Sequence, residues 1–213
     1  GADELRDQCM VIFQAGHETS ATALLWWSWL MAGHPEVSAR AQREVYEQLA
    51  GRDPDAATAS SLPYLQATLK EAMRLYPPVA GVMTRRVVRP FELAGRTLQA
   101  RTLLRITPWV IQRDARWVPE PGRFRPERFL DETAAVPRSA WMPFGVGPRV
   151  CIGQHFAMLE MTLVAALLLQ RCTLQCVPGE PDPRPRMYVT LRPDRPLQLR
   201  LRRRVTAPAV GDA

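Results

Sequence analysis

A lone cysteine, Cys151, stands between a glycine-rich turn and an apolar helix, in the stretch Pro143-Phe144-Gly145-Val146-Gly147-Pro148-Arg149-Val150-Cys151-Ile152-Gly153. Gly145 and Gly147 permit backbone conformations with positive φ and leave room for a large flat ligand to approach the main chain. The N–H groups and positive dipole end of a helix start favour a thiolate over a thiol. Arg149 can neutralise a carboxylate on the same ligand, and Phe144 can keep water from the sulfur. A cysteine in such a place is more often a small buried residue than a ligand, so its neighbours decide between the two interpretations.

Those neighbours resemble the cysteine-ligand loop of the cytochrome P450 family, which has the form F-G-x-G-x-R-x-C-x-G. Every fixed position of that form is filled, by Phe144, Gly145, Gly147, Arg149, Cys151 and Gly153. The resemblance implies a b-type haem, iron protoporphyrin IX, whose iron takes the thiolate of Cys151 as its axial ligand. It also implies that Phe144, Gly145 and Arg149 help to bind this cofactor.

A second resemblance lies in the first helix, where Ala15-Gly16-His17-Glu18-Thr19 is similar to the family's A-G-x-E-T oxygen-binding motif. By this resemblance Thr19 and Glu18 are catalytic, and Ala15 and Gly16 lie against the cofactor. A glycine inside a helix costs about 1 kcal/mol relative to alanine, so Gly16 needs such a reason. An isolated Glu-Thr pair is otherwise ordinary helix surface. A zinc-protease motif H-E-x-x-H is disfavoured, because its second histidine would fall at Ala21.

The family's E-x-x-R pair corresponds to Glu71 and Arg74, and Pro126-Glu127-Arg128-Phe129 resembles its P-E-R-F motif. The i,i+3 spacing puts Glu71 and Arg74 on one helix face, where a solvated surface pair is the simpler interpretation. The resemblance instead implies a buried charge network with Arg128, which holds the scaffold and does not react.

Two weaker correspondences concern the propionate groups of the haem. Arg85 aligns with a family arginine that contacts a propionate, although the adjacent Arg86 could substitute for it. Gln112 stands where many relatives have the histidine of His-Arg-Asp. Any propionate contact from that side chain would therefore change in kind.

Periodicity and turn residues predict helices at 3–32, at 35–49, from Ser60 or Ser61 to Leu75, and at 152–170. Gly33 is the expected stop of the first helix. Strands are expected at 82–88, 102–106, 173–177, 187–191 and 197–201, with a proline-rich meander between 108 and 148. We expect a mainly α fold with small β-sheets, the C-terminal portion of the cytochrome P450 fold. The expected domain is a partial haem domain over 1–205, lacking the family's N-terminal half, followed by a flexible tail over 206–213.

Composition limits the other possibilities. The net charge is +7, but the aromatic residues are not interleaved with the basic ones as a nucleic-acid stacking platform requires. We therefore expect no nucleic-acid partner. The cysteines have no zinc-site spacing and should be reduced: Cys9, Cys151, Cys172 and Cys176. The apolar run from Ala21 to Ala32 is too short to span a bilayer. The expected location is cytoplasmic, with an upstream membrane anchor left open.

The resemblance implies a haem-thiolate monooxygenase that inserts one oxygen atom of O2 into a small organic substrate. Electrons would come from a ferredoxin, a flavodoxin-type protein or a flavin reductase. Small apolar residues near the expected pocket favour a lipophilic substrate: Phe13, Val79, Ala80, Val82 and the turn at Pro193-Asp194. Two alternatives stay open: a truncated, catalytically inactive haem-binding remnant, and a basic interaction module without a cofactor.

Overall fold

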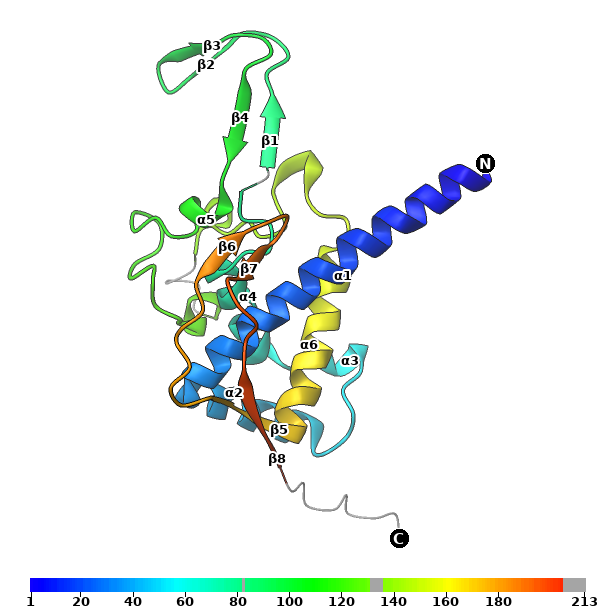
Figure 1. Ribbon diagram of the computed structural model, residues 1–213, viewed down its shortest axis with the longest axis vertical. Coiled ribbons are helices and arrows are strands. Elements are labelled where there is room, and N and C mark those ends of the chain that lie inside the picture. The colour runs from blue at the N-terminus through cyan, green and yellow to red at the C-terminus, as the bar shows by residue number, and fades with distance from the viewer. Residues whose placement is uncertain (82, 131–135, 205–213) are drawn as a thin grey trace.

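The structure is a computed structural model that describes residues 1–81, 83–130 and 136–204 of the chain. Four long helices form the body: α1 (Ala2–Gly33), α2 (Pro35–Leu49), α4 (Pro63–Leu75) and α6 (Gln154–Arg171). Figure 1 shows α1 crossing this body and extending beyond it toward the N-terminus. The predicted flexible tail at 206–213 lies outside the described residues.

The predicted start of α4 is wrong. A short helix, α3 (Ala56–Ala59), occupies the preceding loop, and Ser60 follows this helix instead of capping α4. Asp55 caps α3, because its carboxylate accepts a hydrogen bond from the Thr58 N–H at 2.8 Å. The α4 helix then begins at Pro63, at the position where a missing N–H costs nothing.

Two adjacent tryptophans of α1 fix that helix in the core. Both side chains are fully buried, and each indole N–H has a partner, as a buried donor requires. The Trp27 indole donates to Thr68 Oγ1 of α4 at 2.8 Å, and the Trp26 indole donates to the Leu191 carbonyl at 2.7 Å. The C-terminal half of α1 is thereby held between α4 and a strand near the C-terminus.

The strands form small antiparallel pairs. β1 (Met83–Arg86) pairs with β4 (Leu103–Ile106), and the hairpin of β2 (Phe91–Leu93) and β3 (Arg96–Leu98) follows their outer end. Figure 1 shows this arm projecting from the helical body. β5 (Cys172–Cys176) pairs with β8 (Leu199–Arg203), close to the predicted positions.

One predicted strand is wrong. Residues 187–191 do not form a single strand: Met187 ends β6 (Pro185–Met187), Leu191 begins β7 (Leu191–Pro193), and the three residues between them form the turn. The Tyr188 N–H donates to the Thr190 carbonyl at 3.0 Å inside this turn.

The proline-rich meander is ordered by short helical turns instead of strands. It contains α5 (Pro108–Ile111) and 3-10 helices at Pro126–Phe129, Arg138–Ala140 and Gly147–Arg149. The fold is therefore mainly helical with small sheets, as predicted. Among the helices of the described residues, none is long and apolar enough to cross a membrane.

Candidate functional site

The loop that carries Cys151 closes on itself through its main chain. The Cys151 N–H donates to the Phe144 carbonyl at 2.8 Å, and the Gly145 N–H donates to the Met142 carbonyl at 3.0 Å. Gly145 and Gly147 have φ values of +77° and +74°, so both adopt the left-handed conformation that was expected of them. The loop conformation thus depends on glycine at these two positions.

Cys151 itself lies before the helix and not within it. The α6 helix begins at Gln154 with Gly153 as its N-cap, two residues later than predicted. A Cβ at Gly153 would lie 3.9 Å from the Cys151 sulfur, which is an ordinary contact distance. Cys151 is exposed. The residue is therefore accessible from outside the loop.

Phe144 packs against the core and against Trp141, whose ring centroid lies 6.2 Å away in an edge-to-face arrangement. It is half-buried, whereas Val146, Val150 and Ile152 of the same loop are exposed. Ile152 is fully exposed, at 102% of its reference area. An apolar surface thus surrounds the cysteine, and the predicted shielding of its sulfur by Phe144 stays a prediction.

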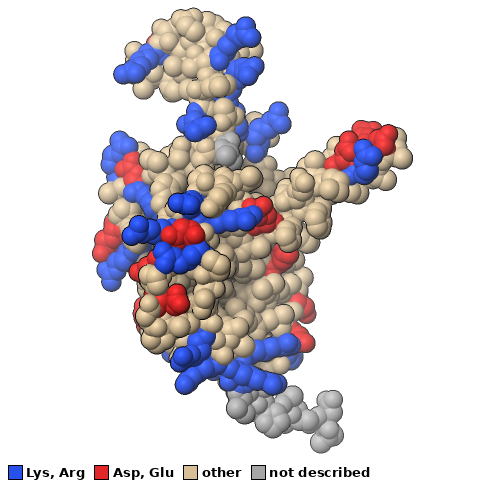
Figure 2. Space-filling view, viewed as in Figure 1, with Lys and Arg blue, Asp and Glu red and all other residues tan. Residues whose placement is uncertain are grey.

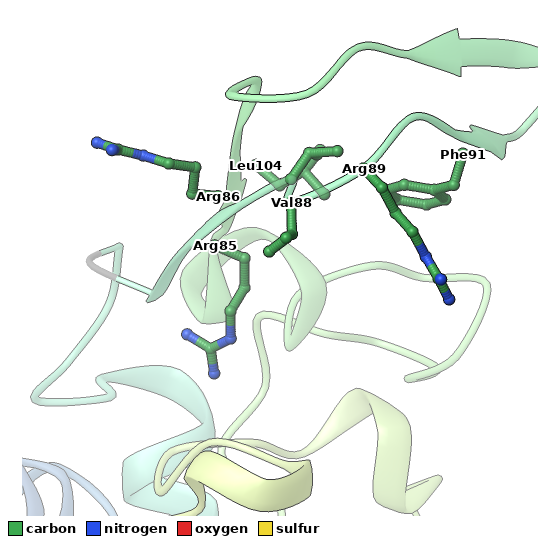
Figure 3. Close-up of a pocket in the computed structure, with 7 residues that line it drawn as sticks. Arg85, Arg86, Val88, Arg89, Phe91 and Leu104 are labelled. Atoms are coloured by element: carbon green, nitrogen blue, oxygen red, sulfur yellow. The ribbon is translucent and has the colours of Figure 1, made fainter.

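Strand β1 adjoins the Cys151 loop, because a Cβ at Gly145 would lie 3.7 Å from the methyl group of Met83. Arg85, two residues further along β1, points toward the body of the molecule, and Arg86 points away from it (Figure 3). Both line an open pocket beside β4, together with Val88, Arg89 and other residues. This arrangement favours Arg85 over Arg86 as the arginine directed toward the site.

The predicted oxygen-binding motif lies on the part of α1 that leaves the helical body. The Thr19 hydroxyl donates to the Ala15 carbonyl at 2.7 Å, along its own helix. Ala15 and Gly16 are exposed, and a Cβ at Gly16 would meet nothing within 4 Å. Among the hydrogen bonds of the described residues, none joins this motif to the Cys151 loop.

Glu18 is not a free side chain. Its carboxylate accepts a hydrogen bond from Thr190 Oγ1 at 2.5 Å, accepts one from Arg192 Nε at 3.1 Å, and is ion-paired with the Arg192 guanidinium. The hydrogen bond from Thr190, followed by that from Arg192, holds the pKa of Glu18 below its ordinary value of 4.5. Sequence reasoning missed both partners, because they are 172 and 174 residues away along the chain.

The predicted charge network is confirmed and fully buried. Arg74 grips Glu71 with two nitrogens, Nε to Oε2 at 2.7 Å and Nη2 to Oε1 at 2.9 Å. Arg128 Nε reaches Glu71 Oε1 at 3.3 Å, and none of the three side chains is more than 1% exposed. Burial lowers the pKa of Arg128, the direction expected for a cation removed from water.

The remaining donors of the two arginines bind main-chain carbonyls of the meander. Arg74 donates to the carbonyls of Gln112, Pro121 and Arg123, and Arg128 donates to that of Glu120. The network therefore anchors an irregular segment to α4. The surface-pair interpretation of Glu71 and Arg74 is wrong.

Gln112 does not face a ligand. Its side chain is fully buried and bonded only to main-chain atoms, donating to the carbonyls of Met73 and Arg74 and accepting from the Met142 N–H. A propionate contact from this residue is therefore not available in this arrangement.

The residues around Cys151 fit a haem. An exposed cysteine, a backbone without side chains at two glycines and exposed apolar neighbours suit a flat, mostly apolar group with one metal atom. Arg85 and Arg149 are exposed, and neither forms an ion pair with an acidic residue in the described part of the chain. Their guanidinium groups are thus available to carboxylates on such a ligand.

Figure 2 shows basic side chains over the β1–β4 arm and near the C-terminal end of β8, whereas those on the middle of the body are mixed with acidic ones. On β8 these are the exposed Arg200, Arg202 and Arg203. Positive charge thus predominates at these two places. Nothing in this distribution changes the expectation that no nucleic acid is bound.

Comparison with known proteins supports the resemblance of the Cys151 loop to the cytochrome P450 family. The chain is 41% identical to cyclooctatin synthase of Streptomyces melanosporofaciens, over 89% of this chain and 42% of that protein. It is 37% identical to pentalenene oxygenase of Streptomyces avermitilis, over 94% of this chain and 44% of that protein. Cyclooctat-9-en-7-ol 5-monooxygenase of Streptomyces melanosporofaciens is also 37% identical, over 83% of this chain and 38% of that protein.

The chain spans less than half the length of each of these relatives. The family model described as Cytochrome P450 matches residues 1–201, almost the whole of this chain. Together with the cysteine loop and the buried arginine network, this match shows that the chain belongs to the cytochrome P450 family.

Proposed function

We propose that this chain is the haem-binding C-terminal part of a monooxygenase that inserts one oxygen atom of O2 into a small lipophilic organic molecule. The observation that carries the proposal is the exposed Cys151 on a loop whose two glycines both have positive φ. A buried cysteine packed among apolar side chains would have favoured the structural interpretation instead. The family membership adds the reaction class.

Cys151 would hold the haem iron through its sulfur, while the bare backbone at Gly145 and Gly147 lets the macrocycle approach. Arg85 and Arg149 would bind its propionate groups. When bound, a haem with a thiolate ligand supplies the electron density that favours O–O cleavage. The role of the protein is to hold, orient and shield this group.

Glu18 and Thr19 would handle protons. The Thr19 hydroxyl donates its proton to the Ala15 carbonyl, so its oxygen is left to accept a hydrogen bond. At its ordinary pKa of 4.5 Glu18 would already be ionised at neutral pH, and the hydrogen bonds from Thr190 and Arg192 lower this pKa further. These two partners therefore weaken Glu18 as a proton acceptor and set how readily its carboxylate takes part in proton transfer.

The substrate is proposed to be apolar. Ala80 is buried, whereas Phe13 is 66% exposed and stacks on His17 across one turn of α1. Val82, another expected pocket residue, lies outside the described residues. Two relatives are named for pentalenene and for cyclooctat-9-en-7-ol, names whose suffixes denote carbon–carbon double bonds. We propose an unsaturated, mostly hydrocarbon substrate for this chain as well.

The electron donor is proposed to be an acidic ferredoxin, a flavodoxin-type protein or a flavin reductase. The exposed arginines of the chain, together with its charge of +7, would attract an acidic surface. A cytoplasmic location stays a prediction.

The test is spectroscopic. The purified chain is mixed with haem, reduced and treated with carbon monoxide, and compared with Cys151→Ser and with Cys172→Ser as a matched control. We expect the far red-shifted Soret band of thiolate ligation in the native chain and in Cys172→Ser, and its loss in Cys151→Ser. A thiolate band that survived in Cys151→Ser, or a band typical of histidine ligation in the native chain, would overturn the assignment. Failure of the native chain to take up haem would favour the basic interaction module without a cofactor.

A further inference from the structure

Gln112 joins α4 to the segment that leads into the Cys151 loop. Its side chain is 0% exposed. Nε2 donates to the Met73 carbonyl at 3.0 Å and to the Arg74 carbonyl at 2.9 Å, and Oε1 accepts from the Met142 N–H at 2.8 Å. The amide uses both of its donors and its acceptor, so one side chain satisfies three main-chain groups.

The two carbonyls belong to the last turn of α4, which ends at Leu75. Carbonyls in a last helical turn have no partner within the helix and need one from elsewhere. Gln112 supplies it from outside the helix. Arg74 returns the contact, because its Nη1 donates to the Gln112 carbonyl at 2.9 Å. The Gln112 side chain thus binds the main chain of α4, and the Arg74 side chain of α4 binds the main chain of Gln112.

From Met142 the contacts continue to the cysteine. The Met142 carbonyl accepts from the Gly145 N–H at 3.0 Å, and the Phe144 carbonyl, between these two residues, accepts from the Cys151 N–H at 2.8 Å. A line of hydrogen bonds thus runs from the α4 carbonyls through the Gln112 amide to the backbone of Cys151. A shift of Met142 would move both ends of the glycine turn.

A neighbouring hydrogen bond gives the segment before the Cys151 loop a second attachment to α4. The Trp141 indole donates to the Lys70 carbonyl at 3.1 Å, one turn before the carbonyls that Gln112 holds. Two successive residues, Trp141 and Met142, are therefore attached to the same helix, Met142 through Gln112. Trp141 alone allows rotation about its side chain, whereas the main-chain bond of Met142 sets the direction in which the loop leaves.

We propose that Gln112 is a positioning residue for the haem ligand, which holds the Cys151 loop in register with α4 through its three buried hydrogen bonds and touches no cofactor itself. The proposal rests on the proposed function of Cys151. A neutral histidine offers one donor and one acceptor. It could therefore accept from the Met142 N–H and donate to one α4 carbonyl, but it could not donate to both carbonyls. Glutamine at this position is therefore the better-matched residue in this chain.

The experiment compares Gln112→Met, which keeps the size but removes every hydrogen bond, with Gln112→His, which keeps one donor and one acceptor. Gln66→Met is the matched control, since its amide also donates from α4 to a main-chain carbonyl, that of Ala59 at 2.8 Å, but does not lead to the loop. Amide hydrogen exchange of the haem-free chains is measured first. Haem affinity and the reduced carbon monoxide spectrum follow for each chain.

We expect Gln112→Met to accelerate exchange at Met142, Gly145 and Cys151 and to leave α2 unchanged. Haem affinity should fall roughly 10- to 100-fold, as for other groups that orient a metal ligand, with part of the bound haem losing its thiolate band. Gln112→His should recover most of both signals, and Gln66→Met should change neither.

The proposal fails if exchange at Met142 and Cys151 is the same in Gln112→Met as in the native chain, or if Gln66→Met has an equal effect. Should Gln112→Met not fold, the proposal stands if Gln112→His loosens the loop amides more than those of α2, and falls if it loosens both equally. Since the exchange measurement needs no haem, it also decides the role of Gln112 if Cys151 proves not to bind iron.

Discussion

The carboxylate of Glu18, in the middle of α1, accepts a hydrogen bond from the hydroxyl of Thr190, in the turn between β6 and β7. In the adjoining strand β7, Arg192 forms an ion pair with Glu18, and the Leu191 carbonyl accepts a hydrogen bond from the Trp26 indole. The Leu191 N–H donates in turn to the Pro78 carbonyl at 2.9 Å, after the end of α4. The C-terminal hairpin therefore connects the acidic residue of the α1 motif with the connection between α4 and β1.

This contact predicts a pH effect at Glu18. Arg192→Gln and Thr190→Val should each raise the pKa of Glu18 toward its ordinary value of 4.5, because each removes a group that stabilises the carboxylate. Since the native pKa is lowered, Glu18 contributes stability above its unfolded pKa and loses it as the pH falls through the folded one. Carboxyl NMR titration measures the shift. Arg195→Gln, whose partner is Asp194, is the control, and an unchanged Glu18 pKa in both variants would contradict the prediction.

Removing Arg128 should destabilise the chain strongly. Arg128→Met removes one of the two cations paired with the buried Glu71 carboxylate and leaves the Glu120 carbonyl without its donor. The expected cost is roughly 3–5 kcal/mol in the free energy of unfolding. Urea unfolding measures this change. The control is Arg123→Met, because the Arg123 side chain is 70% exposed in its pair with Glu120. Similar costs for the two variants would show that the buried network contributes no more to stability than an exposed ion pair.

Gly145→Ala should strain the Cys151 loop. With φ at +77°, an L-residue at this position costs about 1–2 kcal/mol, while its Cβ would meet the neighbouring atoms only at ordinary contact distances. Thermal unfolding of the haem-free chain checks the loss. Gly122→Ala is matched to it, since that glycine has no positive φ and open space around it. If the two alanine variants melt together, the turn does not depend on its left-handed glycine.

Glu44 of α2 should prove important for the start of α4. Its two oxygens accept from the N–H groups of Tyr64 and Leu65, each at 2.8 Å, which are donors without a partner inside the helix. Glu44→Ala should cost about 1–3 kcal/mol in the free energy of unfolding. Because burial raises the pKa of Glu44, the charge itself is not favoured there, and the neutral Glu44→Gln should lose less. The exposed Glu47→Ala is the control in chemical denaturation, and a loss as large as that of Glu44→Ala would count against the cap.

The long helices could be predicted because their patterns are local. The bounds of α2 agree with the sequence prediction, and those of α1 differ by one residue at each end. The start of α4 could not be predicted, since its first N–H groups are held by Glu44 from another helix while two serines offered a plausible local cap. The β6–β7 hairpin was missed because its strands are too short to show their own alternation.

For the site, sequence alone determined the identity of the glycine turn and of Cys151, because φ preference and residue chemistry are properties of single positions and of their spacing along the chain. Only the tertiary structure decided that Arg192 reaches Glu18 and that Gln112 binds Met142. These contacts join residues separated by 174 and 30 positions. Burial and hydrogen-bond partners at such separations follow from the packing of whole elements, which no local pattern records.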